Sequence, residues 1–198
     1  MKRLLVAVSI AALALSLASC GASKSSTKVA SSGSTAVAAK VGGFNDADVA
    51  FAQGMIPHHE QAIEMADMAL DPNAGAGGAV MTLAKAIKGA QDPEIKTMKG
   101  WLTVWGKDAS GAMAGMDHAS SAMPGMMSAD DMTALGKAKG TEFDGMWAKV
   151  MIDHHTGAIE QANTEIKSGK STDAKALAET IVKTQQAEID QMKPLAKA

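Results

Sequence analysis

The sequence is poor in the residues that build disulfides, sheets and nucleic-acid surfaces. It has one cysteine, no tyrosine, three phenylalanines and three tryptophans, so an internal disulfide is excluded and strand-forming runs are scarce. The net charge is −2 and no basic patch occurs, which argues against a nucleic-acid partner. The 198 residues are instead rich in alanine and contain 15 methionines, a composition that favours helices.

The N-terminus has the organisation of a secretory signal. Lys2 and Arg3 precede the apolar run LLVAVSIAALALSL, which is too short for a comfortable membrane span. The run ends in LASC, which resembles the lipobox where bacterial lipoproteins are cleaved and acylated. We therefore expect a signal peptide over residues 1–19 and a lipid on Cys20. An ordinary signal peptide with an incidental cysteine is the alternative.

The residues that follow are expected to tether a single folded domain. Residues 20–43 consist mostly of Ser, Gly, Ala and Lys, which cannot bury a core. The folded domain is expected over residues 44–198. Together, the signal and the tether predict a protein that is exported across the inner membrane and lipid-anchored at the cell envelope, on its periplasmic or extracellular face.

Four of the five histidines lie in two copies of one motif. MIPHHEQAIEMA begins at Met55, and MIDHHTGAIEQA begins at Met151. A second pair of similar segments follows each copy: LAKAIKGAQDPEIKTM begins at Leu83, and LAETIVKTQQAEIDQM begins at Leu177. The repeat unit is therefore a histidine-bearing segment followed by a segment with Gln, Glu and Met.

Apolar residues at helical spacing predict five helices, over about residues 46–70, 79–105, 129–138, 142–168 and 173–195. The four long helices form two hairpins, at residues 45–105 and 141–195, joined by a Met-rich connection over residues 106–140. One hairpin cannot bury its apolar stripe alone, so the two are expected to pair as a four-helix bundle. The fold class is all-α.

The repeated motifs also resemble a known family. The paired MI-x-HH-xx-AI and Q-xx-EI-xx-M segments, and the FD before the second copy, resemble the bacterial family called domain of unknown function 305. The resemblance covers nearly all of residues 44–195. It implies a ferritin-like helical fold, a secreted or lipid-anchored protein, and a link to copper binding and copper tolerance.

The histidines face the core on the predicted helices, so a bundle can bring all four to one interior region. The candidate imidazole ligands are His58, His59, His154 and His155. The candidate thioether ligands are Met55, Met65, Met98, Met151 and Met192. Imidazole suits Cu(II) and thioether suits Cu(I), so copper in either state is the expected ion, although another transition metal would fit. From the ordinary pKa of histidine, we expect this site to weaken between about pH 7.5 and about pH 5.

Polar residues also fall on the apolar stripes of the partner helices. They are Gln91, Glu94, Gln185 and Glu188. A buried carboxylate needs a partner, and accepting a histidine N–H would orient the other ring nitrogen towards a metal. Direct coordination of the metal is the second interpretation. A purely structural His/Glu network that sets the register of the bundle is the third.

The connection between the hairpins carries a second set of candidate ligands. They are Met113, Met116, His118, Met123, Met126 and Met127. Thioethers in a Gly-rich segment gain little from packing, which favours loose capture of Cu(I) by a device separate from the bundle. A docked hydrophobic flap is the alternative.

The predicted function is therefore that of a copper-binding envelope lipoprotein that sequesters or buffers copper without catalysing a reaction. A di-iron enzyme would need Glu-x-x-His, but Met55 and Met151 stand three residues before His58 and His154. Haem held by His and Met, and a structural surface module, remain as further alternatives.

The lipid anchor can be tested directly. Cys20→Ser is expected to block acylation, because serine offers no thiol, and to move the protein out of the membrane fraction or stall the precursor. Fractionation and mass spectrometry of the mature N-terminus measure both. A serine variant that matured and stayed anchored like the wild type would show that the lipobox assignment is wrong.

Overall fold

The computed structural model of the protein describes residues 43–109 and 123–197. Within these ranges all regular structure is helical and no strand occurs, so the all-α prediction is confirmed. The long helices are α1 (Asp46–Leu70), α2 (Gly78–Trp105), α4 (Gly140–Ser168) and α5 (Thr172–Met192). The short elements are α3 (Ala129–Lys137), η1 (Pro72–Ala74) and η3 (Leu195–Lys197). None of the helices in the described ranges is long and apolar enough to cross a membrane.

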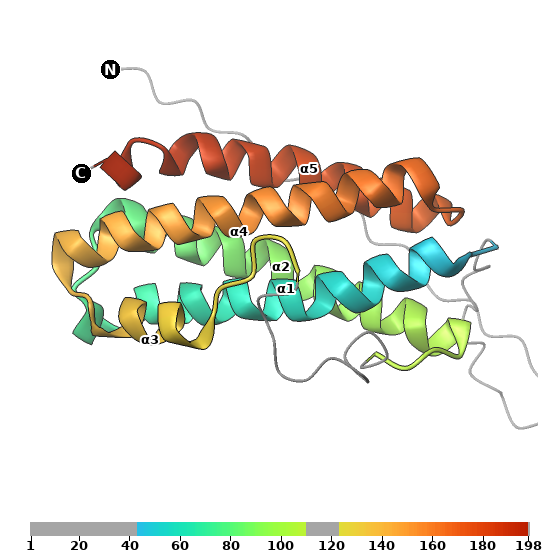
Figure 1. Cartoon of the computed structure of the whole chain (residues 1–198), viewed down its shortest axis with the longest axis horizontal. Coiled ribbons are helices and arrows are strands. Elements are labelled where there is room, and N and C mark those ends of the chain that lie inside the picture. The colour runs from blue at the N-terminus through green and yellow to red at the C-terminus, as the bar shows by residue number, and fades with distance from the viewer. Residues whose placement is uncertain (1–42, 110–122, 198) are drawn as a thin grey trace, which may run out of the picture. The chain divides into compact units, whose positions relative to one another are not determined.

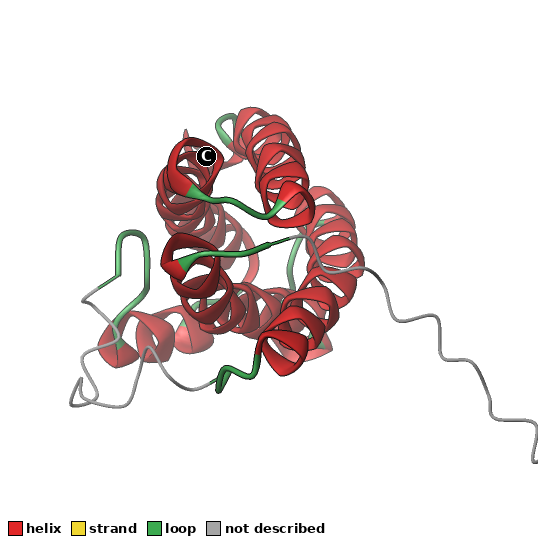
Figure 2. Ribbon diagram, turned by 90° about the vertical axis from the view of Figure 1, so that its right-hand side faces the viewer, coloured by secondary structure: helices red, strands yellow, loops and turns green. Residues whose placement is uncertain are grey.

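The four long helices pack as two hairpins (Figure 1). α1 lies against α2 and α4 lies against α5, while α1 and α4 join the two hairpins. Figure 2 views the helices nearly end-on and shows them around a shared interior. The predicted four-helix bundle of two repeated hairpins is therefore what the chain forms. α5 ends at Met192, three residues before the predicted end, because Pro194 has no N–H for a further helical turn.

Side chains cap α1, the first helix of the first hairpin, and α5, the second helix of the second hairpin. Asn45 accepts hydrogen bonds from the backbone N–H groups of Ala47 and Asp48, and the Asp48 carboxylate accepts the N–H of Asn45 at 2.6 Å. Ser171 caps α5 in the same way. These caps satisfy N–H groups that the first turn of a helix leaves without partners. α1 and α2 continue through Pro57 and Pro93.

The apolar interior is divided into two clusters, one towards each end of the bundle. The Trp147 cluster includes Met65, Leu83, Ile87, Leu135, Phe143, Trp147, Met151 and Met192. The Phe51 cluster includes Val49, Phe51, Met55, Ile95, Met98, Leu102 and Ile181. Each long helix contributes to both clusters, and on each helix the two contributions are separated by polar residues. The boundary between the clusters is therefore a polar layer across the bundle.

Two carboxyl groups meet near the start of α1. Asp48 is fully buried and accepts the N–H groups of Lys170 and Ser171, at 3.1 and 2.8 Å. Glu165 of α4 is 1% exposed, and burial, followed by the neighbouring Asp48 carboxyl, raises its pKa to about 8. At neutral pH, Glu165 is therefore protonated, which removes the repulsion that two buried carboxylates would suffer.

This raised pKa predicts how stability depends on pH. Between the unfolded pKa of about 4.5 and the folded pKa of about 8, the folded protein holds a proton that the unfolded chain lacks. The free energy of unfolding should therefore fall as pH rises through this window, and Glu165→Gln should abolish that part of the fall. Urea unfolding at pH 5, 6.5 and 8 measures it. Glu160→Gln, an exposed change on the same helix, is the control, and parallel slopes for Glu165→Gln and wild type would contradict the assignment.

Candidate metal centre

The polar layer is built from the same four positions in each hairpin, two on each helix. Its members are His58 and His59 of α1, Gln91 and Glu94 of α2, His154 and His155 of α4, and Gln185 and Glu188 of α5. None of the four imidazoles is more than 1% exposed. The structure thus brings together all eight of the bundle's predicted polar site residues, because the two clusters pack on either side of them.

Two histidines are each held by a carboxylate. His59 Nε2 lies 2.8 Å from Glu94 Oε2, and His155 Nε2 lies 2.7 Å from Glu188 Oε2. A carboxylate can only accept, so Nε2 carries the hydrogen in both rings and a neutral ring keeps a lone pair on Nδ1. Glu94 and Glu188 therefore each accept the histidine N–H that the sequence predicted for them, in both hairpins.

The other two histidines meet each other at the centre of the layer. The ring centroids of His58 and His154 are 3.8 Å apart, and the ring planes make an angle of 46°. His58 Nε2 donates to the backbone carbonyl of Pro124 at 3.1 Å. Among the described residues, neither ring nitrogen of His154 has a hydrogen-bond partner.

Burial keeps these two central rings neutral. It lowers the pKa of His58 to about 3, and it lowers the pKa of His154 well below its usual value. A neutral imidazole is the form that binds a metal ion. The loss of binding that we expected between pH 7.5 and pH 5 is therefore wrong for His58, whose ring takes up a proton only in much stronger acid.

Unpartnered nitrogen atoms are the unusual feature of the layer. The Nδ1 atoms of all four histidines are buried and have no hydrogen-bond partner among the described residues, and the same holds for His154 Nε2. The side-chain amide of Gln91 likewise has no partner in the described ranges. Most buried polar atoms in folded proteins are hydrogen-bonded, so five orphaned imidazole nitrogens at one level of a bundle need an explanation. A neutral imidazole has one N–H and one lone pair, so the four rings offer four lone pairs, and these fit a metal ion with a preference for nitrogen ligands.

Methionines border the layer on both sides. Met55 and Met98 belong to the Phe51 cluster, Met151 and Met192 belong to the Trp147 cluster, and all four are fully buried one helical turn from a layer residue. Met65 is equally buried but lies farther along α1, and its backbone carbonyl accepts the Trp147 N–H at 2.9 Å. The equivalent position in the second repeat is a glutamine, so Met65, unlike the other four methionines, is not matched by a methionine in the other hairpin.

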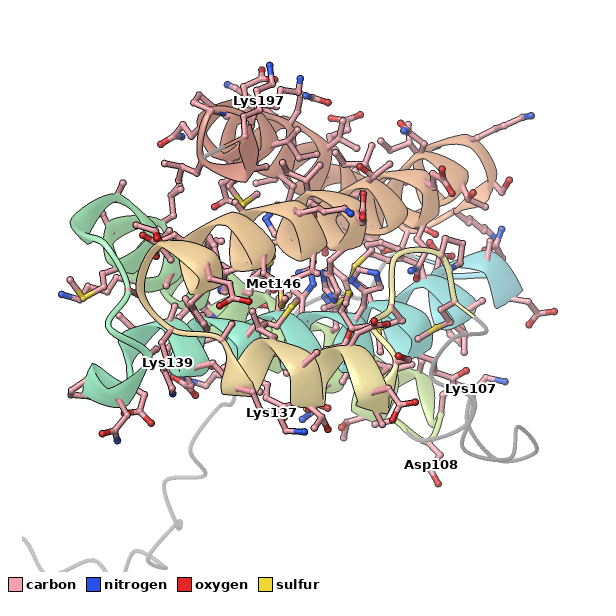
Figure 3. All side chains as sticks on the ribbon, turned by 60° about the vertical axis from the view of Figure 1, so that its left-hand side comes forward. Lys107, Asp108, Lys137, Lys139, Met146 and Lys197 are labelled. Carbon is pink, nitrogen blue, oxygen red and sulfur yellow. The ribbon has the colours of Figure 1, made fainter. Side chains whose placement is uncertain are left out.

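No ready-made cage of His, Cys, Asp and Glu ligands is present in the described ranges. No group of three or more His, Cys, Asp or Glu side chains is arranged there to hold a metal ion. An ion in the layer would therefore bind thioether sulfur as well, or would require the His58 and His154 rings, which are tilted against each other, to rotate. Figure 3 shows nitrogen and sulfur atoms among the side chains that fill the bundle.

The predicted ligands of the connection divide into two groups. Met113, Met116 and His118 lie outside the described residues, as does Cys20. Met123 and Met126 are partly buried, while Met127 is 9% exposed and packs in the Trp147 cluster. Met126 and Met127 also line a hollow beside Met146, which is labelled in Figure 3. We expected this segment to be separate from the bundle, but the bond from His58 to Pro124 joins it to the layer.

Sequence reasoning missed two residues that hold this segment. Gln61 Nε2 donates to the Met127 carbonyl at 3.0 Å, and Gln61 Oε1 accepts the Met127 N–H at 2.7 Å. Gly157 lies directly against Pro124 and Gly125. The available signal was the repeat itself, because Gln61 and Gly157 occupy the same position in the two copies and differ.

The fold and the layer define a helical-bundle protein with a buried histidine centre. Residues 48–196 match the family model described as domain of unknown function, DUF305, and the chain belongs to this family. No curated protein matches the sequence.

Solved structures of the family share the fold. A DUF305 protein from Streptomyces coelicolor, described as a candidate secreted protein, is 30% identical over 75% of this chain and 91% of its own, with a TM-score of 0.67. CopM in its Cu(II)-bound form is 35% identical over 76% and 95% of the two chains, with a TM-score of 0.64. CopM in its Cu(I)-bound form is 31% identical over the same shares, with a TM-score of 0.61.

The His–Glu bonds predict a stability pattern in metal-free protein. Glu188→Leu should lower the free energy of unfolding by about 1–3 kcal/mol, because the buried His155 N–H loses its acceptor. His155→Leu combined with Glu188→Leu should recover part of this loss. Glu94→Leu should cost less than Glu188→Leu, since the Glu94 side chain is 15% exposed and water can replace it. Urea unfolding with a chelator present measures all three, and a Glu188→Leu protein as stable as wild type would contradict the pairing.

Proposed function

We propose that this protein binds copper in the polar layer and sequesters or buffers it at the cell envelope. The observation that carries the proposal is the set of four buried Nδ1 atoms that find no partner in residues 43–109 and 123–197, in rings of which three have Nε2 already hydrogen-bonded. The metal-bound forms of CopM, a relative of the same fold, support copper as the ion. In this proposal, copper is the ion that the protein carries and is not a cofactor for a reaction.

The residues of the layer suit both oxidation states. His58, His59, His154 and His155 offer neutral nitrogen, which Cu(II) prefers. The thioethers at the borders of the layer offer soft sulfur, which Cu(I) prefers. The proposed thioether ligands are Met55, Met65, Met98, Met151 and Met192. Glu94 and Glu188 act behind His59 and His155, since each already holds an imidazole N–H.

The surface offers an approach to the layer. A groove of about 560 Å³ between α2 and α5 has Glu188 in its wall, together with Thr184 and Gln191. The same Glu188 carboxylate bonds His155 on its inner side. An acidic side chain that faces both a groove and a buried imidazole provides a route by which a cation can enter.

The alternatives have less support in the geometry. A di-iron centre needs carboxylates where α1 and α4 carry the buried thioethers of Met55 and Met151. Haem between α1 and α4 would have to separate His58 from His154, whose centroids are 3.8 Å apart. A purely structural network would be expected to satisfy its nitrogens, and five nitrogens of this layer have no partner within the part of the chain that the structure describes.

Anchoring at the envelope is part of the same proposal. We place the lipid on Cys20, with residues 20–43 as the tether to the bundle. The relative from Streptomyces coelicolor, described as a candidate secreted protein, supports export. The methionines of the connection, including Met123, Met126 and Met127, are proposed to capture Cu(I) before it enters the layer.

Copper titration of paired variants tests the site. The double change His58→Ala and His59→Ala, and the double change His154→Ala and His155→Ala, should each weaken copper binding by at least about 100-fold, since losing even an outer-shell partner of a metal ligand costs 10–100-fold. Competition with a chromophoric chelator measures affinity for Cu(I) and Cu(II), and circular dichroism verifies folding.

The matched control for these variants is Met81→Leu, which removes a thioether that is 37% exposed and outside the layer. Its affinity should equal that of the wild type. If both folded double-alanine proteins bound copper like the wild type, the layer would be a structural network. Binding would then reside elsewhere, for example in the methionines of the connection.

A further inference from the structure

Residues 123–127, called the strap below, are seated on the bundle beside the polar layer. Figure 1 shows this segment, in yellow before α3, running across α1 and α4. One end of the strap is held by Gln61, whose amide both donates to and accepts from the backbone of Met127. The other end lies over α1, where Met123 Sδ is 3.8 Å from the position that a Cβ on Gly54 would take.

The middle of the strap touches the backbone of α4. A Cβ on Gly157 would overlap the Pro124 carbonyl, so no larger residue fits under the seated strap. On the strap itself, Gly125 has a φ of 81°, and a Cβ there would lie 2.7 Å from the Asp153 carbonyl oxygen and 2.8 Å from that of His154. Two glycines thus let the two backbones meet without intervening side chains.

This seat breaks the symmetry of the repeat. Gln61 in the first copy and Gly157 in the second occupy the same position of the repeat. The amide of Gln61 holds the strap by hydrogen bonds, and the missing side chain at Gly157 leaves room for the strap. This asymmetry also makes the hydrogen bonding of the two central histidines different. His58 gains the Pro124 carbonyl as an acceptor, whereas His154, its equivalent, has no such partner among the described residues.

We propose that Gln61 and Gly157 are positioning residues for the copper site, because they seat the strap so that the Pro124 carbonyl fixes His58 with its hydrogen on Nε2 and its Nδ1 directed to the ion. The proposal rests on the proposed function. It gives the two central rings different tasks: His58 is a fixed nitrogen donor, and His154 is an adjustable one. The seated strap also brings the Met123 thioether to the edge of the layer, one helical turn before His58, where a soft ion such as Cu(I) would meet it.

The test uses two variants that unseat the strap in different ways. Gly157→Ala inserts a methyl group where the Pro124 carbonyl lies, and Gln61→Leu removes both hydrogen bonds to Met127 without adding bulk. Gly89→Ala on α2 is the matched control, because a Cβ there meets nothing within 4 Å. Gln61→Leu keeps the test valid if Gly157→Ala does not fold.

Two measurements separate positioning from general stability. Long-range ¹H–¹⁵N spectra of the metal-free protein report which ring nitrogen of each histidine carries hydrogen, and Cu(I) competition reports affinity. Both strap variants should lose the single Nε2–H form of His58 and bind Cu(I) about 10–100-fold more weakly. His155, held by Glu188, should keep its tautomer, and Gly89→Ala should match the wild type in both measurements.

The outcomes distinguish the two proposals. If the wild type binds copper and both strap variants keep the His58 tautomer and the wild-type affinity, the positioning role is overturned and the proposed function stands. If the wild type binds no copper, the proposed function fails and the positioning role for a copper site fails with it. A loss of affinity confined to the strap variants, with the His58 signal changed, supports the inference.

Discussion

Four imidazoles buried between two apolar clusters are the constraint around which this bundle is arranged. A ring nitrogen removed from water is costly without a partner, so each N–H requires an acceptor in the interior. Glu94 and Glu188 supply two acceptors from the neighbouring helices, and the Pro124 carbonyl supplies a third. The register of each hairpin follows from this, because α2 and α5 must place a carboxylate level with the histidines that α1 and α4 carry.

The repeat accounts for what the two hairpins share, and its imperfections account for what they do not. His59 with Glu94 and His155 with Glu188 are nearly the same unit, with N···O distances of 2.8 and 2.7 Å. The two hairpins differ where the strap packs. Gln61 of the first copy corresponds to Gly157 of the second, and residues 123–127 lie against both. A twofold arrangement of histidines thereby has one central ring bonded to the strap, His58, and one, His154, without a hydrogen-bond partner in the described part of the chain. Two equal hairpins could not produce this difference.

Much of the architecture could be predicted from the sequence because it is periodic. Apolar spacing located all five helices within a few residues, and the repeat identified the hairpins and the layer residues His58, His59, His154 and His155 with Glu94 and Glu188. These predictions depend on residues close together in the chain, where helical geometry relates spacing to direction. The same reasoning gave His58 the ordinary pKa of histidine, which is wrong, since the depth of burial of His58 depends on the packing of all four helices.

The tertiary structure alone decided the contacts between residues that no spacing connects. The tilted ring contact of His58 with His154, the bond from His58 to Pro124 and the meeting of Asp48 with Glu165 each join distant segments. The strap can pack on α4 only because Gly157 has no side chain. A pattern of apolar residues does not reveal such a position, so the sequence did not predict this contact. The sequence by itself therefore determined the helices, their pairing and the level of the histidines, since these follow from local periodicity. The partner of each ring and its protonation were decided by which backbones approach one another, and that is settled only when the whole interior packs.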